Sequence, residues 1–301
     1  MAGIELSEKC FFEKFLPLVR ERLPEAEAHV AAGLVGGGSE CFGFDDEISA
    51  DHDFSNGFYI WLTDDDDIKY GVALARIYRE CVDPPSKKSA APRPRGVITI
   101  GDFYARYTGR RGLPEGALEW LYLPESALAE ATNGKVFFDG VGEFSTIRSA
   151  LAESMPEDVR KKKLAARLLT MAQAGQYNYS RCLSHGERGA ARLALSEFAG
   201  AAISAIFLLN GRYAPFYKWS LRAMRGLFEL SHLEAKLTAL LCEANEQTCA
   251  ALVEDICAAV AAHLRQAGLS QSHSDYLEAH AYEVFNSIRD RDLRAMHILE
   301  G

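Results

Sequence analysis

The spacing of hydrophobic residues changes near residue 155, and this change limits the folds that the chain can adopt. Upstream, short β-like runs alternate with helical stretches and loops. Downstream, every apolar pattern has helical spacing. This order is typical of a small α/β domain followed by an antiparallel helical bundle. We therefore predict an α+β chain with a mixed-sheet domain over residues 1–154 and an all-α helical bundle domain over residues 155–301.

Short apolar runs follow a helical stretch at residues 6–22 in the first half. The runs cover residues 29–35, 58–62, 97–100, 118–123 and 136–138. Their lengths, and their boundaries at glycine, proline and acidic clusters, are typical of short strands. The aspartates at 64–67 predict a solvated turn, and the proline-rich basic stretch 84–95 predicts an exposed loop.

The second half contains amphipathic segments, the first of which begins at Pro156. The later segments cover residues 187–209, 216–230, 233–244, 247–266 and 274–296. The most apolar stretch, Ala190–Leu209, is interrupted by Arg192 and Glu197. We therefore predict that this stretch is a buried helix rather than a membrane span.

Charge and cysteine content argue against several classes of protein. A net charge of −9 provides no overall attraction to nucleic acid or to an anionic membrane, so we expect no membrane or DNA partner. The seven scattered cysteines contain no CxxC pair, which predicts reduced structural thiols. Glu5, Glu8 and Lys9 occupy positions where a signal peptide would be apolar. These features predict a soluble cytoplasmic protein.

A pair of aspartates is the first feature that points to chemistry. Asp51 and Asp53 flank a histidine just before a strand-like run. Residues two apart on a strand project to the same face. Two carboxylates on one face can hold Mg²⁺ through oxygen ligands and leave coordination positions for phosphate oxygens. The pair therefore predicts a metal site.

A glycine-rich turn precedes the aspartates. Gly36 to Ser39 reads Gly-Gly-Gly-Ser and follows the first strand-like run. Without side chains, the Gly37 and Gly38 amides and the Ser39 hydroxyl can approach a triphosphate closely. A turn of this composition and an Asp-x-Asp pair each occur often without function. Their order and spacing together predict a nucleotide site.

This arrangement resembles the nucleotidyltransferase superfamily of the DNA polymerase β type, whose signature is a Gly-Ser turn followed about a dozen residues later by Asp-x-Asp. More narrowly, the chain resembles the DUF4037 family, with a C-terminal bundle similar to that of kanamycin nucleotidyltransferase. The resemblance spans most of the chain. Its matching stretches are Gly38–Glu40, Asp45–Glu47, Asp51–Asp53, Glu119–Leu121, Asn133–Phe137, Gln173–Arg181 and Tyr213–Trp219.

The resemblance implies transfer of a nucleotide, AMP from ATP by analogy with the family, to an acceptor hydroxyl. It also implies a site for two Mg²⁺ or Mn²⁺ ions, in which a third carboxylate from a neighbouring strand joins Asp51 and Asp53. Glu119 is our candidate, because a charge within the apolar run 118–123 would be costly without a metal or partner. Asp139 is the reserve candidate.

Two cations of the second half are candidates for contact with the triphosphate. Arg181 ends the stretch QAGQYNYSR, and Lys218 lies among the aromatic residues of 213–219. An arginine would bind phosphate as a bidentate fork and a lysine as a point charge. The alternative is that the aromatic residues pack between helices while Lys218 extends to solvent. We predict nucleotide contact for Lys218 and helix packing for most of the aromatic residues.

Two other functions fit the same sequence. One is a non-catalytic, antitoxin-like nucleotide-binding module. The other is HEPN-type ribonuclease activity in the helical domain, for which Arg291 and His297 match the expected spacing only loosely. Metal-dependent NTP binding separates a nucleotidyltransferase from the ribonuclease, and covalent transfer separates it from the binding module. The acceptor stays open between a small molecule, a protein and an RNA end.

Overall fold

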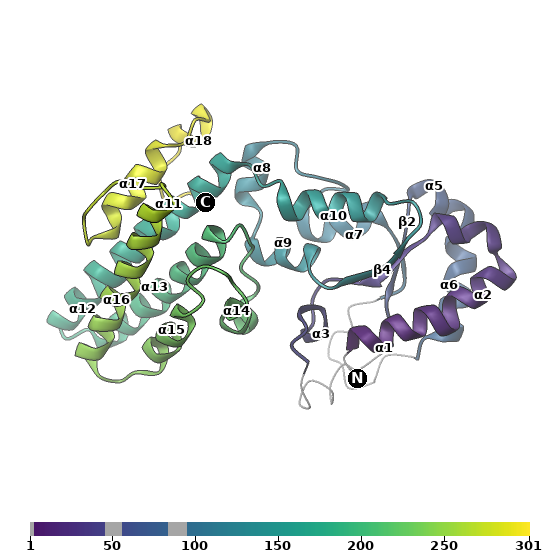
Figure 1. Ribbon diagram of the computed structural model, residues 1–301, viewed down its shortest axis with the longest axis horizontal. Helices are drawn as coiled ribbons and strands as arrows, with labels where there is room; N and C mark the ends of the chain where they lie inside the picture. The colour runs from purple at the N-terminus through teal and green to yellow at the C-terminus, as the bar shows by residue number, and fades with distance from the viewer. Residues whose placement is uncertain (1–2, 46–55, 84–94) are drawn as a thin grey trace. The chain divides into compact units, whose positions relative to one another are not determined.

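The structure, a computed structural model, describes residues 3–45, 56–83 and 95–301, so Asp51 and Asp53 lie outside the described residues. Contacts divide the chain into two compact units, whose elements are labelled in Figure 1. Unit 1 comprises Met1–Pro114 and Ala127–Ser154, and unit 2 comprises Glu115–Ser126 and Met155–Gly301. The second part of unit 2 begins at the predicted domain boundary, but Glu115–Ser126 had been predicted as part of the first domain.

Unit 1 is built around a four-stranded mixed sheet in the order β3-β2-β1-β4. Its strands are β1 (Ala31–Leu34), β2 (Tyr59–Leu62), β3 (Val97–Thr99) and β4 (Lys135–Asp139). Strand β1 runs antiparallel to both neighbours, so that Ala32 pairs with Ile60 of β2 and with Phe138 of β4. Strands β2 and β3 are parallel. Because β1 is an inner strand, the turn that follows it leaves from the middle of the sheet.

Helices cover both faces of this sheet (Figure 1). The described helices of unit 1 are α1 (Gly3–Cys10), the π-helix η1 (Phe11–Phe15), α2 (Leu16–Arg22), the 3-10 helix η2 (Pro24–His29), α3 (Ser39–Phe42), α5 (Asp64–Asp66), the π-helix η3 (Asp67–Gly71), α6 (Val72–Cys81), α7 (Ile100–Thr108), α9 (Glu125–Thr132, which begins in unit 2) and α10 (Glu143–Glu153). The alternation along β2 separates two cores. Ile60 belongs to a cluster with Phe11 and Phe15, whereas Trp61 stacks on Phe144 of α10 at 3.6 Å between ring centroids.

All the regular elements of unit 2 in the described residues are helices. Its helices are α8 (Ala117–Tyr122), α11 (Glu157–Met171), the π-helix η4 (Ala172–Tyr179), α12 (Ser180–Ser184), α13 (Arg188–Leu209), α14 (Tyr217–Met224), α15 (Leu233–Cys242), α16 (Glu246–Gln266), α17 (Leu277–Asn286) and α18 (Arg291–Ala295). Helix α11 packs against α13 and α17. Leu168, Phe198 and Ile256 are among the fully buried residues of the resulting core.

Two helices of unit 2, α13 and α16, are long and apolar enough to cross a membrane by length and composition alone. Phe198 and Ile206 of α13 and Ile256 of α16 are fully buried in the core of the unit. Core helices meet the same criterion as membrane spans, so the criterion is weak evidence for a span here.

The predicted α+β class, with its small mixed sheet, is confirmed, and several local predictions are wrong. The run 118–123 forms helix α8, because a mainly apolar run of only six residues does not by itself distinguish a strand from a helix. The aspartates 64–67 begin a helix that Thr63 caps by accepting from the Asp66 N–H at 3.2 Å. The stretches 216–230 and 274–296 contain shorter helices than their spacing predicted.

Candidate functional site

The glycine-rich turn leaves strand β1 and leads directly into α3. Gly36 and Gly38 have φ angles of 120° and 130°, a conformation that residues with a side chain rarely adopt. Gly38 is the residue before the helix, and Ser39 is its first residue. The turn therefore presents main-chain groups and one hydroxyl where other sequences would place larger side chains.

Residues just before β4 hold this turn in place. Asn133 donates Nδ2–H to the Gly36 carbonyl at 2.7 Å, and its Oδ1 accepts from the Gly36 N–H at 2.8 Å. Gly134 donates its N–H to the carbonyl of Cys41 in α3 at 2.9 Å. Nη2 of Arg148 donates to the carbonyls of Asn133 and Gly134 at 3.0 and 3.3 Å. The segment thus fixes both the entry to the turn and the helix that follows it.

A largely buried ion pair lies beside the turn. Nη2 of Arg95 donates to Oε1 of Glu40 in α3, and the two side chains are only 17% and 12% exposed. Nη1 of Arg95 also donates to the Gly57 carbonyl, just before β2, at 3.3 Å. Burial acts to lower the pKa of Arg95, but the Glu40 carboxylate, with smaller contributions from Cys41 and Tyr59, raises it overall. The guanidinium is therefore charged.

The prediction of an exposed loop is wrong at its last residue, Arg95. Residues 84–94 lie outside the described part of the chain. The sequence placed Arg95 in this loop because its neighbours are rich in proline and basic residues. Its partner, Glu40, is 55 residues away in the chain and could not be identified from the stretch itself.

Described residues anchor both sides of the segment that carries the aspartate pair, residues 46–55. Before it, Oδ2 of Asp45 accepts from the N–H of Gly3 at 2.7 Å. After it, the Gly57 carbonyl accepts from Oγ of Ser7 at 3.0 Å as well as from Arg95. Helix α1 and Arg95 therefore fix the chain on either side of Asp51 and Asp53, which themselves lie outside the described residues.

The strand predicted to carry Glu119 is a helix. Glu119 lies in α8 of unit 2, and its Oε2 accepts from the N–H of Glu115 at 3.0 Å, one turn earlier. This contact is that of a residue in the first turn of a helix. The premise of a neighbouring strand is therefore wrong. A role for Glu119 as the third metal ligand stays a prediction, but the neighbouring strand on which that prediction was based is helix α8 instead.

The reserve candidate, Asp139, ends strand β4 away from the turn. It pairs with Ala31 at the start of β1, whereas the turn follows the end of β1. Its two carboxylate oxygens accept from the N–H groups of Gly142 and Ser145, both at 2.8 Å, and so cap helix α10. Within the described ranges, no group of three or more His, Cys, Asp or Glu residues is placed to hold a metal ion.

The two cations predicted to contact phosphate, Arg181 and Lys218, both belong to unit 2 and are exposed. Nζ of Lys218 lies 4.7 Å from the ring centroid of Trp219. The prediction that most neighbouring aromatic residues pack between helices is wrong for Phe216 and Tyr217, which are 47% and 80% exposed. Nucleotide contact by Arg181 and Lys218 stays a prediction.

Unit 2 contains a buried charged cluster that sequence reasoning missed. Oε1 of Glu125 accepts from Oγ of Ser204 at 2.6 Å and lies 3.8 Å from Nη2 of Arg167. Nζ of Lys163 donates to the Leu123 carbonyl at 3.0 Å. Burial lowers the pKa of Lys163 to about 8, with Glu125 opposing the shift and Arg167 adding to it. These bonds hold the start of α9 against α11 and α13.

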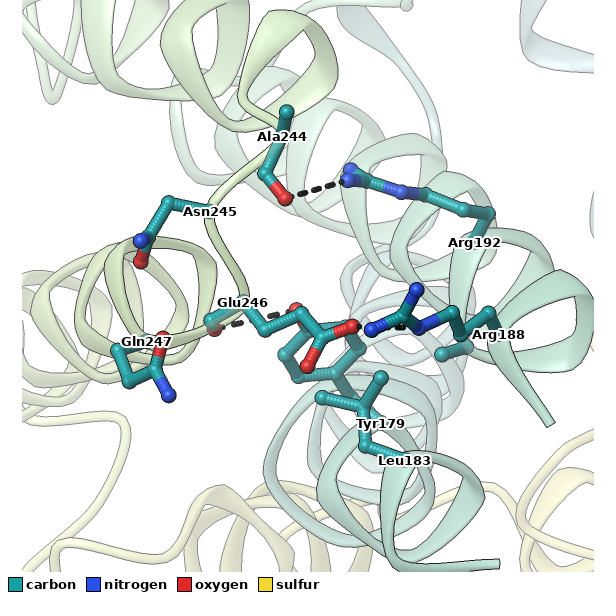
Figure 2. Close-up of a pocket in the computed structure, with 9 residues that line it drawn as sticks. Tyr179, Leu183, Arg188, Arg192, Ala244, Asn245, Glu246 and Gln247 are labelled. Atoms are coloured by element: carbon teal, nitrogen blue, oxygen red, sulfur yellow. Dashed lines mark hydrogen bonds and ion pairs between the residues drawn. The ribbon is translucent and has the colours of Figure 1, made fainter. Parts of the chain in front are cut away.

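A pocket of about 360 Å³ opens between η4, α12, α13 and the start of α16 (Figure 2). Nε of Arg188 lies 3.1 Å from Oε1 of Glu246, and Tyr179 donates its hydroxyl to the Glu246 carbonyl at 3.2 Å. Arg192 donates to the carbonyls of Glu243 and Ala244 at 2.6 and 3.2 Å. Both arginines thus make bonds that join α13 to the segment around the start of α16, and we assign them no chemical role.

The fold and the site together describe the class of protein. It is an α+β chain in which a glycine-rich turn, held by side chains from distant parts of the sequence, leaves the middle of a small mixed sheet, and a helical bundle follows in the sequence. Residues 120–220 match the profile of the family described as "Domain of unknown function (DUF4037)", which confirms the DUF4037 resemblance for this segment. The matched segment includes Glu125, Lys163 and Arg167. The glycine-rich turn and the aspartate pair precede it.

The other comparisons are more distant. No curated protein matches the sequence. Among solved structures, a nucleotidyltransferase-like protein from Exiguobacterium sibiricum 255-15 is similar over 92% of this chain and 80% of its own, at 12% identity and a TM-score of 0.39. A TM-score this low does not establish a shared fold.

Proposed function

We propose that the protein is a nucleotidyltransferase that moves a nucleotide from an NTP, by family analogy AMP from ATP, to an acceptor hydroxyl. One observation carries the proposal. The Gly36–Ser39 turn has glycines with positive φ angles at 36 and 38 and is held by Asn133, and the aspartate pair follows it in the order of the nucleotidyltransferase motif, which supports the assignment of a phosphate-binding turn.

The residues of the turn would bind the phosphates. The Gly36 amide is engaged by Asn133, so the Gly37 and Gly38 amides and the Ser39 hydroxyl are the groups that we assign to the β- and γ-phosphate oxygens. These groups can orient the triphosphate and hold its leaving group in line with the attacking oxygen.

The carboxylates Asp51 and Asp53 would hold Mg²⁺ or Mn²⁺, because hard oxygen ligands suit both ions. When bound, such an ion supplies a Lewis acid for the phosphoryl oxygens. In the reaction, the acceptor hydroxyl releases its proton to solvent and its oxygen forms a bond to the α-phosphorus. The bond between that phosphorus and the bridging oxygen breaks, and pyrophosphate leaves.

The proposal is tested by following label from two forms of ATP in the presence of Mg²⁺ and a cell extract. Label at the α-phosphate should enter an acceptor, whereas label at the γ-phosphate should leave as pyrophosphate. Asp51→Asn/Asp53→Asn should abolish this transfer, because the metal ligands are lost. The type of acceptor that carries the label would decide between a small molecule, a protein and an RNA end.

Other outcomes would contradict the proposal. Metal-dependent ATP binding without transfer, in every extract tested, would support the non-catalytic module. RNA cleavage that persists in the aspartate double variant would support a ribonuclease. Incorporation of γ-label would identify a phosphotransferase rather than a nucleotidyltransferase.

A further inference from the structure

Arg95 is a largely buried cation of unit 1 that lies next to the glycine-rich turn. The sequence had predicted phosphate-binding cations only in unit 2. Its guanidinium is held from two sides, by the Glu40 carboxylate of α3 and by the Gly57 carbonyl before β2. Glu40 is the second residue after Gly38. Arg95 therefore joins helix α3, which follows the turn, to the residue two positions before strand β2.

The pair lies directly against the turn. A Cβ atom at Gly38 would lie 2.5 Å from Oε2 of Glu40, so the carboxylate fills the space that a side chain at Gly38 would need. The Arg95 guanidinium binds the other oxygen of the same carboxylate. The positive charge of Arg95 is thus separated from the backbone of the turn by one carboxylate group.

Stability alone does not explain a largely buried ion pair in this place. The cost of removing two charges from water offsets much of their attraction, and apolar side chains of similar volume often serve as well. A guanidinium has five N–H donors in a rigid plane, so it can bind two anions along different edges. Glu40 and Gly57 restrict the orientation of Arg95, which lowers the entropy lost when a ligand binds.

We propose that Arg95 is a phosphate-binding residue of the nucleotide site, and that Glu40 positions it beside the Gly36–Ser39 turn. This inference rests on the proposed function. Arg95 supplies positive charge for the triphosphate from within unit 1, on a side chain that the fold already orients. Lys218 and Arg181 are exposed on unit 2, and each would have to lose side-chain freedom on binding.

Calorimetric binding of MgATP, adenosine and inorganic triphosphate to Arg95→Met tests the inference. The loss of a partly desolvated charge-assisted bond should weaken MgATP and triphosphate about ten- to hundredfold. Adenosine carries no phosphate, so its affinity should not change. The matched control is Arg20→Met, which removes an exposed arginine of unit 1 that is paired with Glu27. It should bind all three ligands as the wild type does.

Glu40→Gln separates phosphate binding from a merely structural pair, and it also serves if Arg95→Met does not fold. Glutamine keeps a side-chain oxygen that can accept from Arg95, so the guanidinium stays in position, but it removes the competing negative charge. Arg95 should therefore bind triphosphate as tightly as in the wild type or more tightly. A structural pair would instead make Glu40→Gln and Arg95→Met weaken binding alike. Arg95→Lys keeps the charge but loses the fork, so its affinity should fall between those of the wild type and Arg95→Met.

Failure of the inference and failure of the proposed function look different. If Asp51→Asn/Asp53→Asn loses MgATP while Arg95→Met retains it, Arg95 is not a phosphate-binding residue and the proposed function stands. If Glu40→Gln weakens triphosphate binding as much as Arg95→Met does, the pair is structural. If the wild type binds neither MgATP nor inorganic triphosphate, both proposals are overturned.

Discussion

Gly134→Ala is expected to destabilise unit 1 more than alanine at Gly36 or Gly38 of the glycine-rich turn. We call the segment Asn133–Gly134, together with Arg148 and Arg95, the clamp of this turn. Gly134 has a φ angle of 67°, and a Cβ atom there would lie 2.0 Å from the carbonyl oxygen of Leu34 at the end of β1. Backbone atoms cannot move away as the end of a flexible side chain can. The left-handed backbone conformation at residue 134 and the steric overlap of the added Cβ atom with the Leu34 carbonyl should together lower the free energy of unfolding of Gly134→Ala by about 3–4 kcal/mol.

Gly109→Ala is the matched control. Gly109 ends helix α7 in the same unit with a φ angle of 72°, but a Cβ atom there would meet nothing within 4 Å. Alanine there should therefore show only the conformational cost, about 1 kcal/mol. Urea unfolding followed by tryptophan fluorescence, to which the buried Trp61 of unit 1 contributes, measures both variants. Equal losses in the two variants would contradict the close approach of the Gly134 segment to β1.

Lys163 should make the stability of unit 2 increase between about pH 8 and pH 10.5. Burial lowers its folded-state pKa from the ordinary 10.5 to about 8. Between these two values the unfolded chain binds more protons than the folded chain, so stability rises with pH. Below pH 8 the buried charge is present and its cost is complete. The shift corresponds to about 3 kcal/mol, relieved as the pH approaches the unfolded-state value.

Lys163→Met should remove the part of the pH dependence that comes from Lys163, because methionine carries no charge. Lys162, whose pKa burial also lowers, keeps its own part in both proteins. The variant leaves the Leu123 carbonyl without its donor, so its stability at pH 10 should be lower than that of the wild type. Lys161→Met, on the same helix but with an exposed amino group, should follow the wild-type profile. Unfolding midpoints at pH 7 and pH 10 for the three proteins give the comparison. Parallel profiles for the wild type and Lys163→Met would contradict the lowered pKa.

The strands of unit 1 could be predicted from sequence because each is a short, apolar run between turn residues. The predicted runs 58–62 and 136–138 overlap β2 and β4. Run 118–123 had the same composition but forms α8, and its six residues showed no period that could separate the two structures. The hydrophobic pattern therefore predicted where the apolar runs lie. It did not predict which of these runs become strands that pair in the sheet.

The clamp around the turn could not be predicted, because its partners are far apart in sequence. Asn133 bonds to Gly36 across 97 residues, and Arg95 bonds to Glu40 across 55. The Asn-Gly dipeptide at 133–134 is typical of a turn, but nothing local to it identifies its partner. The Glu125 cluster likewise brings together Ser204 and Arg167 from separate helices. A charged residue's role in this protein depends on contacts that only the fold creates.

The nucleotide site itself is tested by calorimetric binding of MgATP to Asp51→Asn/Asp53→Asn. The wild type should bind MgATP, and the double variant should lose binding or weaken it strongly while its melting midpoint without ligand changes little. Asp64→Asn/Asp65→Asn removes the same charge from exposed positions in unit 1 and should bind as the wild type does. MgATP affinity in Asp51→Asn/Asp53→Asn equal to that of the wild type would contradict a nucleotidyltransferase site at this turn.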